Sequence, residues 1–334
     1  KYVPNLNQYP LSLLRNTTTA TISSTENNSD KEEEDSYETI PFFWHIPKAA
    51  GTTMKNIMTS CYGLTRAERI QHPQSLDIVN GILNMDTHSL KGITSSKEAG
   101  IISNNYANLL VSSLLHEASA LFTPQKSGQL FTIMRHPIHT SVSLFYYLSY
   151  AKWEQFYNPE FGNMTLYEYA SSSGSNSDGH AAMIDNWLVR YLSHEERGEI
   201  SIWHLNFAKE MLETKFVIGL FDHLEESIFR FQYYFGWNHD NHNSSSSGGG
   251  NHTAMTKAKK TQCVCNSMKR HFNQHEHAEI VEGSDEWNLL LEKNKYDMEL
   301  YEFAIDLYER QGNTIFTELL EKRETKKESG LFCE

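Results

Sequence analysis

The sequence is poor in cysteine and in basic side chains, and it contains no long apolar run. Four cysteines in 334 residues are too few for a disulfide scaffold. Twenty-nine basic side chains against 42 acidic ones give a net charge of −13, which argues against broad binding to nucleic acid or to an anionic membrane surface. No stretch approaches the roughly 18 apolar residues of a membrane-spanning helix.

The composition is nevertheless that of a folded chain, with 39% hydrophobic and 12% aromatic residues. Residues 1–38 are polar and without periodicity, and they predict a disordered stem. A single folded domain, large enough for an enzyme, is expected over residues 39–320, with flexible insertions near 171–179 and 238–256. A charged tail follows at 321–334. Because the chain begins with lysine, we expect that a preceding signal or anchor has been removed.

Cys263 and Cys265 form an isolated C-x-C pair, followed by three histidines, His271, His275 and His277. This spacing matches no standard zinc site, so zinc is the alternative and a disulfide in a lumenal protein is the favoured interpretation. Asn-x-Ser/Thr sequons point weakly to the same secretory route; they occur at Asn16, Asn27, Asn163, Asn243 and Asn251.

The most informative stretch is PFFWHIPKAAGTT, residues 41–53. Its apolar beginning predicts a buried strand, and its small residues predict a tight turn into a helix. At such a turn, backbone N–H groups, the Thr52 and Thr53 hydroxyls and the Lys48 ammonium converge, while Gly51 permits close approach of a ligand. This combination predicts a phosphate or sulfate site. An ordinary strand–turn–helix with a surface lysine is the alternative, and a Walker A loop is excluded because the lysine precedes the glycine.

A second strand–turn–helix carries the motif RHPIHTSVS, residues 135–143. Residues 129–134 predict a buried strand that ends at Arg135, and Pro137 predicts the start of a helix. Ligands of open α/β sheets bind at the carboxyl ends of strands, where Arg135 is expected. Ser143 lies eight residues further on, about two helical turns later, and completes a second predicted anion site.

Other segments complete the expected fold. Apolar runs at 109–115 and 215–219 predict two more strands, while residues 63–92 suggest mixed loop and short helix. Residues 181–192 and 294–309 have helical spacing. Strands that alternate with helices predict an α/β protein with a central, mostly parallel sheet flanked by helices.

These motifs together resemble those of the Golgi-type carbohydrate sulfotransferases of the heparan and chondroitin kind, which use 3′-phosphoadenosine-5′-phosphosulfate (PAPS). HIPKAAGTT resembles their 5′-phosphosulfate loop, and RHPIHTSVSLFYY resembles their 3′-phosphate motif. FVIGLFDHLEES (216–227) and NKYDMELYEFAIDLYERQ (294–311) are similar to their later strand–helix and terminal helix. The resemblance covers about residues 41–312 in the family's order.

The resemblance implies a P-loop-NTPase-like three-layer fold and PAPS as sulfuryl donor, with no metal required. It implies a glycan acceptor and a place in the Golgi lumen, as a type II membrane protein whose anchor is not in this chain. It assigns the 5′-phosphosulfate to Lys48, Ala50, Gly51, Thr52 and Thr53, and the 3′-phosphate to Arg135 and Ser143. Lys48 would also neutralise the leaving phosphate.

The acceptor hydroxyl needs a base, and a histidine is suited to this near neutral pH. The resemblance implies His116, because related glycan enzymes carry a histidine after the strand that precedes the arginine strand. His88 is the second candidate, and His45 is less suited because it lies within the first strand. A packed or helix-capping role is the alternative for His116.

Three features depart from the better-known members of that family. Ala49 and Ala50 form an unusual pair, and His136 stands where an aspartate is often found; both are compatible with cofactor binding. The acidic net charge argues against a heavily sulfated acceptor. Basic residues at 257–260 and 269–270 offer a local acceptor patch, although solvated surface charge is the favoured interpretation.

Two other functions compete with the sulfotransferase. A P-loop-type kinase is disfavoured because the chain has no GK[ST] motif and no evident magnesium-binding aspartate after a strand. A non-catalytic glycan- or nucleotide-binding relative would share the fold without turnover. Sulfation of protein tyrosine is a variant of the leading hypothesis that would favour a carboxylate base. The sequence does not specify the acceptor sugar or the oligomeric state.

Overall fold

The computed structural model describes residues 11–12, 38–71, 74–154, 157–172, 185–195, 197–237, 255–270, 278–317, 319 and 333. Most of the predicted stem, insertions and tail lie outside these residues, as do every sequon but Asn163 and the histidines after the C-x-C pair. Leu11 is an exception within the predicted stem: it is buried in the core and bridges Gly128.

Four parallel strands form the central sheet in the order β5-β1-β6-β7. The strands are β1 (Glu38–Trp44), β5 (Leu110–Ser112), β6 (Lys126–Met134) and β7 (Phe216–Leu220). They are almost entirely apolar where they cross the core, as expected for strands covered on both faces. The predicted strands are confirmed, and so is the predicted α/β class with a parallel sheet flanked by helices.

A smaller sheet has the order β2-β4-β3 and consists of β2 (Arg66–Glu68), β3 (Ile78–Val79) and β4 (Ile82–Asn84). The prediction of loop and short helix for residues 63–92 was therefore wrong. These strands have two or three residues each, which is too short for an alternating pattern to show in the sequence.

The helices follow the strands in the alternation expected from the sequence. The first half of the described chain contributes α1 (Gly51–Asn56), continued by the π-helix η3 (Ile57–Cys61), then α2 (Leu90–Glu98), α3 (Leu115–Ser119), α4 (Pro137–Tyr150), the 3₁₀-helix η4 (Pro159–Asn163) and α5 (Leu166–Ser171). The second half contributes α6 (Trp187–Ser193), α7 (Ile202–Lys215), the 3₁₀-helix η6 (Phe221–His223), α8 (Leu224–Tyr234), α9 (Lys257–Lys269), α10 (Asp285–Lys293) and α11 (Lys295–Thr314).

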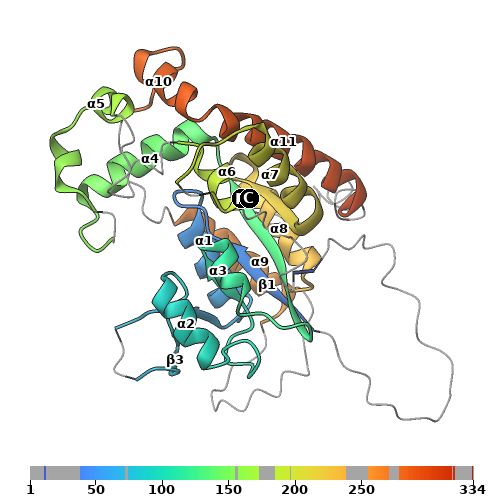
Figure 1. Ribbon diagram of the computed structural model, residues 1–334. Coiled ribbons are helices and arrows are strands. Elements are labelled where there is room, and N and C mark those ends of the chain that lie inside the picture. The colour runs from blue at the N-terminus through green and yellow to red at the C-terminus, as the bar shows by residue number, and fades with distance from the viewer. Residues whose placement is uncertain are drawn as a thin grey trace, which may run out of the picture.

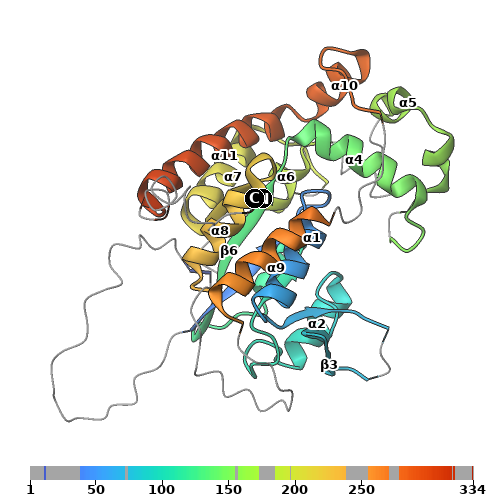
Figure 2. The ribbon, with the colours of Figure 1, turned by 180° about the vertical axis from the view of Figure 1, so that it is seen from behind.

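Two groups of buried residues account for the packing. The main core surrounds the central sheet and includes Phe42, Phe131 and Phe216. A second, smaller core joins α4, α5 and α10, which extend together beyond one end of the sheet (Figures 1 and 2). Both figures also show α9 beside α1 and the long helix α11 across α7. The loop after β1 and the start of α4 thus lie where the two cores meet.

The described residues contain no helix with the length and apolarity needed to cross a membrane. All four cysteines are paired, Cys61 with Cys263 and Cys265 with Cys333. The favoured interpretation of the C-x-C pair as disulfide-forming is confirmed. The zinc alternative is wrong for these two cysteines, because their sulfurs are already bonded.

Candidate functional site

The loop between β1 and α1 has an unusual backbone. Lys48 and Ala50 both adopt positive φ angles, 61° and 59°, although neither is a glycine. Each such residue costs about 1 kcal/mol or more, and strain of this kind persists where the surrounding structure maintains it. Residues with positive φ in a tight turn are a common component of the loops that bind anions through backbone N–H groups. The tight turn from strand to helix that the small residues predicted is confirmed, and anion binding by it stays a prediction.

Gly51 begins α1 directly over the imidazole of His45. A Cβ atom at this position would overlap the His45 ring, so only glycine fits. Burial, and then the positive charge of Lys55, lower the pKa of His45 to about 3, so this imidazole is neutral at physiological pH. His45 thus lies against Gly51 beneath the loop, in keeping with the expectation that it is less suited than His116 or His88 to act as the base.

Arg135 reaches the same loop from the end of β6. Its Nη1 donates a hydrogen bond of 2.9 Å to the Lys48 carbonyl, and its guanidinium lies 4.5 Å from the centre of the Phe221 ring. β1 and β6 are neighbouring strands, with Phe43 aligned with Phe131, so their carboxyl ends meet at one edge of the sheet. The two motifs predicted as separate anion sites are adjacent.

The two cations of this site repel each other. Burial, and then the Arg135 charge, lower the pKa of Lys48 to about 8, while Glu154 acts in the opposite direction. Burial also lowers the pKa of Arg135, although Asp222 and Tyr301 partly offset this. Among the described residues, no carboxylate lies within ion-pair distance of Arg135. An anion bound here would relieve the repulsion.

The hydroxyl residues of the two motifs are placed with different degrees of exposure. Thr53 is buried, and Thr52 is half-buried in the first turn of α1. Ser143 is half-buried in the second turn of α4. Ser141 is instead the serine that lines the cavity beside Arg135, and its hydroxyl donates to the Pro137 carbonyl.

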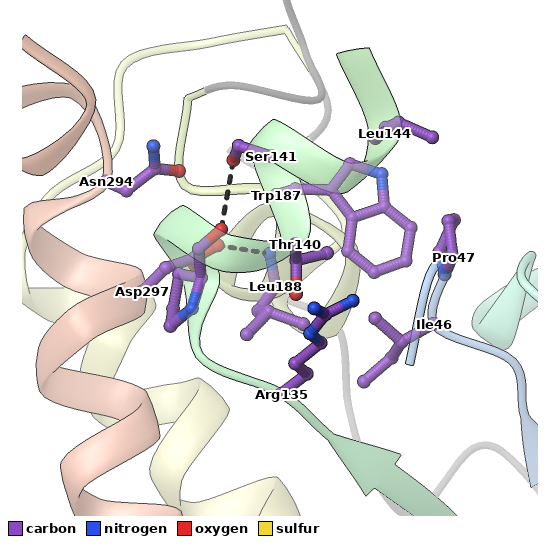
Figure 3. Close-up of a pocket in the computed structure, with 11 residues that line it drawn as sticks. Ile46, Pro47, Arg135, Thr140, Ser141, Leu144, Trp187, Leu188, Asn294 and Asp297 are labelled. Atoms are coloured by element: carbon purple, nitrogen blue, oxygen red, sulfur yellow. Dashed lines mark hydrogen bonds between the residues drawn. The ribbon is translucent and has the colours of Figure 1, made fainter. Parts of the chain in front are cut away.

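A small cavity of about 20 Å³ lies beside Arg135, and Figure 3 shows the Arg135 side chain directed toward Trp187 and Ile46 across it. Its volume is near that needed for about one water molecule. It is too small to enclose a nucleotide, so a nucleotide that contacts Arg135 must bind along the strand ends.

Asp297 of α11 forms one wall of this cavity and holds the start of α6 (Figure 3). Its two carboxyl oxygens accept hydrogen bonds of 2.8 Å from the backbone N–H groups of Leu188 and Val189. Burial raises the pKa of Asp297 to about 7, against the lowering effect of the two N–H donors. Asn186, just before α6, in turn caps the start of α11, because its side-chain oxygen accepts hydrogen bonds from the N–H groups of Tyr296 and Asp297.

His88 lies on the loop side of the site. Its ring centre is 6.4 Å from that of His45, which is itself beneath Gly51. The His88 Nδ1 atom is 3.3 Å from the Thr87 hydroxyl, and Nε2 is buried without a hydrogen-bond partner among the described residues. Burial lowers the pKa of His88, so its imidazole is neutral near pH 7, and the same burial disfavours protonation.

His116 lies within α3 rather than at the end of a strand, and it packs against the end of α6. Its Nε2 lies 3.0 Å from the Leu192 carbonyl, and its ring stacks on His194 with 4.4 Å between centres. Burial, and then His194, lower its pKa to about 4. The described contacts connect His88, but not His116, to the Lys48 loop; which of the two is the base stays a prediction.

Several side chains of the site were not expected from the sequence. Tyr147 lies under Lys48, with 4.1 Å between the ammonium and the ring centre, and Phe221 lies under Arg135. Phe221 directly follows β7, so the rule that selected Arg135, a residue at the carboxyl end of a parallel strand, would have found it. His45 and Tyr147 lie within the two quoted motifs, but no sequence signal predicted their contacts with Gly51 and Lys48 or the place of Asp297.

No protein-family model matches this chain, and a search of curated proteins found no match.

Proposed function

We propose that this protein is a PAPS-dependent sulfotransferase that transfers the sulfuryl group to a hydroxyl of a carbohydrate acceptor. The observation that carries the proposal is the adjacency of the Lys48 loop and Arg135 at the ends of two neighbouring parallel strands. Two cations held together, with no carboxylate partner at Arg135 among the described residues, suit a ligand with separated phosphate groups. The succession of strand β1, a loop with two residues at positive φ, and helix α1 supports a P-loop-NTPase-like fold.

The residues of the site suit a donor that carries a 5′-phosphosulfate and a 3′-phosphate. The loop N–H groups, Lys48, Thr52 and Thr53 would hold the first group, and Arg135 with Ser143 would hold the second. PAPS, when bound, supplies a sulfuryl group on a good leaving phosphate.

Catalysis then depends on charge and proton placement by the chain itself. As the acceptor oxygen–sulfur bond forms and the bond from sulfur to the 5′-phosphate oxygen breaks, Lys48 offsets the negative charge that grows on the leaving oxygen. The acceptor proton passes to a neutral histidine, His88 or His116. The lowered pKa of each keeps it unprotonated at neutral pH, and the burial that lowers it also makes each a weaker proton acceptor than an exposed imidazole.

The disulfides support a lumenal site of action. Paired cysteines persist in oxidising compartments such as the secretory pathway and are rare in the cytosol. We therefore propose the Golgi lumen as the place of function, in keeping with a glycan acceptor.

The test is calorimetric titration with 3′-phosphoadenosine-5′-phosphate (PAP), the desulfated product, in the presence of EDTA. We expect micromolar binding that weakens by about tenfold or more in Arg135→Ala, because a charge-assisted fork is lost. Arg135→Lys keeps the charge without the fork and should be intermediate. Arg310→Ala is the matched control, since Arg310 forms only exposed ion pairs.

Three results would contradict the proposal. If the folded protein does not bind PAP, the nucleotide site is absent. Binding of ATP with magnesium in place of PAP would favour the P-loop-type kinase. PAP binding without sulfuryl transfer to any glycan acceptor would instead favour the non-catalytic relative.

A further inference from the structure

One exposed aromatic side chain lies next to the Lys48 loop. Trp153, just beyond the end of α4, has 71% of its surface exposed, the largest exposure of any described tryptophan. Single exposed apolar side chains are common on protein surfaces, so the significance of Trp153 depends on where it lies and what holds it. Its neighbours Tyr147 and Tyr150 are within aromatic contact, with ring centres 6.4 and 6.2 Å away.

The orientation of this indole is set by hydrogen bonds. Trp153 Nε1 donates to the Tyr147 hydroxyl at 3.2 Å, and that hydroxyl donates to Glu154 Oε1 at 2.6 Å. Tyr147 is itself buried, so it anchors one edge of the indole to the protein. The indole is therefore an exposed ring on a fixed support, which lowers the entropy lost when a ligand binds it.

The same tyrosine connects Trp153 to the anion site. The Lys48 ammonium lies 4.1 Å from the centre of the Tyr147 ring, on the loop that we assign to the 5′-phosphosulfate. Only one side chain thus separates the exposed indole from the place where a sulfuryl group would be transferred. An acceptor must lie beside the donor, so the platform is in the position that an acceptor requires.

The charges around Trp153 indicate what kind of acceptor fits. Its chain neighbours Lys152 and Glu154 are exposed and of opposite sign. Recognition of a polyanionic glycan requires a cluster of basic side chains, whereas the chain neighbours of Trp153 are one lysine and one carboxylate, and Lys48, the next cation, is assigned to the donor. An uncharged sugar is compatible with this surface. Its ring C–H groups, which carry partial positive charge, complement the negative face of an indole.

We propose that Trp153, supported by Tyr147 and Tyr150, is an acceptor subsite that stacks on one face of an uncharged pyranose ring beside Lys48. This inference rests on the proposed function for its chemistry, but it makes a separate statement about sugar binding.

The experiment is saturation-transfer NMR on the full chain with PAP present. The probes are lactose, cellobiose and maltose, with a sulfated chondroitin disaccharide as the charged comparison. We expect transfer to the ring C–H protons of at least one neutral disaccharide. Trp153→Ala should weaken this binding by about tenfold or more, as for other aromatic anchors, and Trp153→Phe should retain part of it. Trp203→Ala, on α7, removes another exposed tryptophan and should behave as wild type.

PAP affinity, measured separately by calorimetry, distinguishes the two proposals. Unchanged PAP binding with sugar signals that do not depend on Trp153 would overturn the acceptor subsite and leave the nucleotide site intact. Trp153-dependent sugar binding without PAP binding would support the subsite and contradict the sulfotransferase. A Trp153-dependent preference for the charged disaccharide would overturn the neutral acceptor. Self-association of the wild-type protein in sedimentation that disappears in Trp153→Ala would also overturn the acceptor subsite, because it would assign the exposed indole to a contact between two copies of the chain.

Discussion

At the level of single residues, Gly51 and His45 are coupled by their packing. The imidazole occupies the space that any side chain at position 51 would need. We predict that Gly51→Ala lowers the free energy of unfolding by about 1–3 kcal/mol, as for other overpacked sites, and weakens PAP binding by displacing the loop. Urea unfolding and calorimetry measure the two effects.

The double variant His45→Ala/Gly51→Ala provides the internal check. Removal of the ring makes room for the added methyl group, so the two changes should be strongly non-additive. Gly162→Ala is the matched control, because a Cβ atom there meets only an ordinary contact. Additive effects of the His45 and Gly51 substitutions would show that the overlap does not limit this site.

Lys48 makes the anion site sensitive to pH. Its pKa of about 8 is below that of an ordinary lysine, because burial and Arg135 both disfavour the charge. The Lys48 cation, which we propose attracts the phosphosulfate, is present below this pKa and lost as pH rises through it. We predict that PAP affinity falls by up to about tenfold between about pH 7 and pH 9, since one pKa unit corresponds to a factor of ten.

Lys48→Arg tests this assignment, because arginine stays charged over the whole range. The variant should bind PAP with an affinity that no longer changes between these pH values. An equally steep fall in the Lys48→Arg protein would assign the pH dependence to another group.

Among the elements, α6 and α11 hold each other by their N-terminal ends. Asp297 on α11 accepts the N–H groups of Leu188 and Val189, and Asn186 accepts those at the start of α11. We predict that Asp297→Ala lowers the free energy of unfolding by about 1–3 kcal/mol, because it leaves two buried N–H donors without acceptors.

The effect should extend to the neighbouring cavity, where Asp297 and Arg135 share a wall. PAP binding by Asp297→Ala is therefore expected to weaken as well. Asp306→Ala on the same helix is the control, since Asp306 is exposed and forms a surface ion pair with Arg310. Equal stability of the two variants in urea would contradict a structural role of the reciprocal caps.

Across the molecule as a whole, the disulfides connect distant parts of the chain. Cys61 ends the helix that follows the Lys48 loop and is bonded to Cys263 on α9, 202 residues away in sequence. We predict that Cys61→Ser/Cys263→Ser lowers the free energy of unfolding by about 2–5 kcal/mol, as for loss of other native disulfides. Thermal and urea unfolding without reductant measure this.

The second disulfide offers a comparison within the same protein. Cys265–Cys333 closes a shorter loop, with a separation of 68 residues, so its removal should have the smaller effect. Reductant should lower the free energy of unfolding of the wild-type protein toward that of a variant in which all four cysteines are replaced by serine. Identical unfolding of oxidised and reduced wild-type protein would show that the pairs do not contribute to stability.

Local patterns in the amino-acid sequence were sufficient to predict the four central strands, their parallel class and the positions of the two strand–turn–helix motifs. Runs such as Phe42–Trp44 and residues 129–134 are local signals, and the ends of parallel strands necessarily meet at one edge of a sheet. Arg135 and the Lys48 loop are therefore expected at the same edge from the order of strands and motifs along the chain. Short strands such as Ile78–Val79 were missed, because two residues carry no periodicity.

The distant side chains that support these motifs are fixed by tertiary packing instead. Tyr147 beneath Lys48 and Asp297 beside Arg135 are contacts between elements far apart in sequence, and His45 beneath Gly51 depends on how the loop between β1 and α1 folds back. Tertiary packing also determines which cysteines pair and why His88 and His116 have different surroundings. Such contacts depend on how helices pack against the sheet, and packing leaves no local pattern in the chain from which a partner can be predicted.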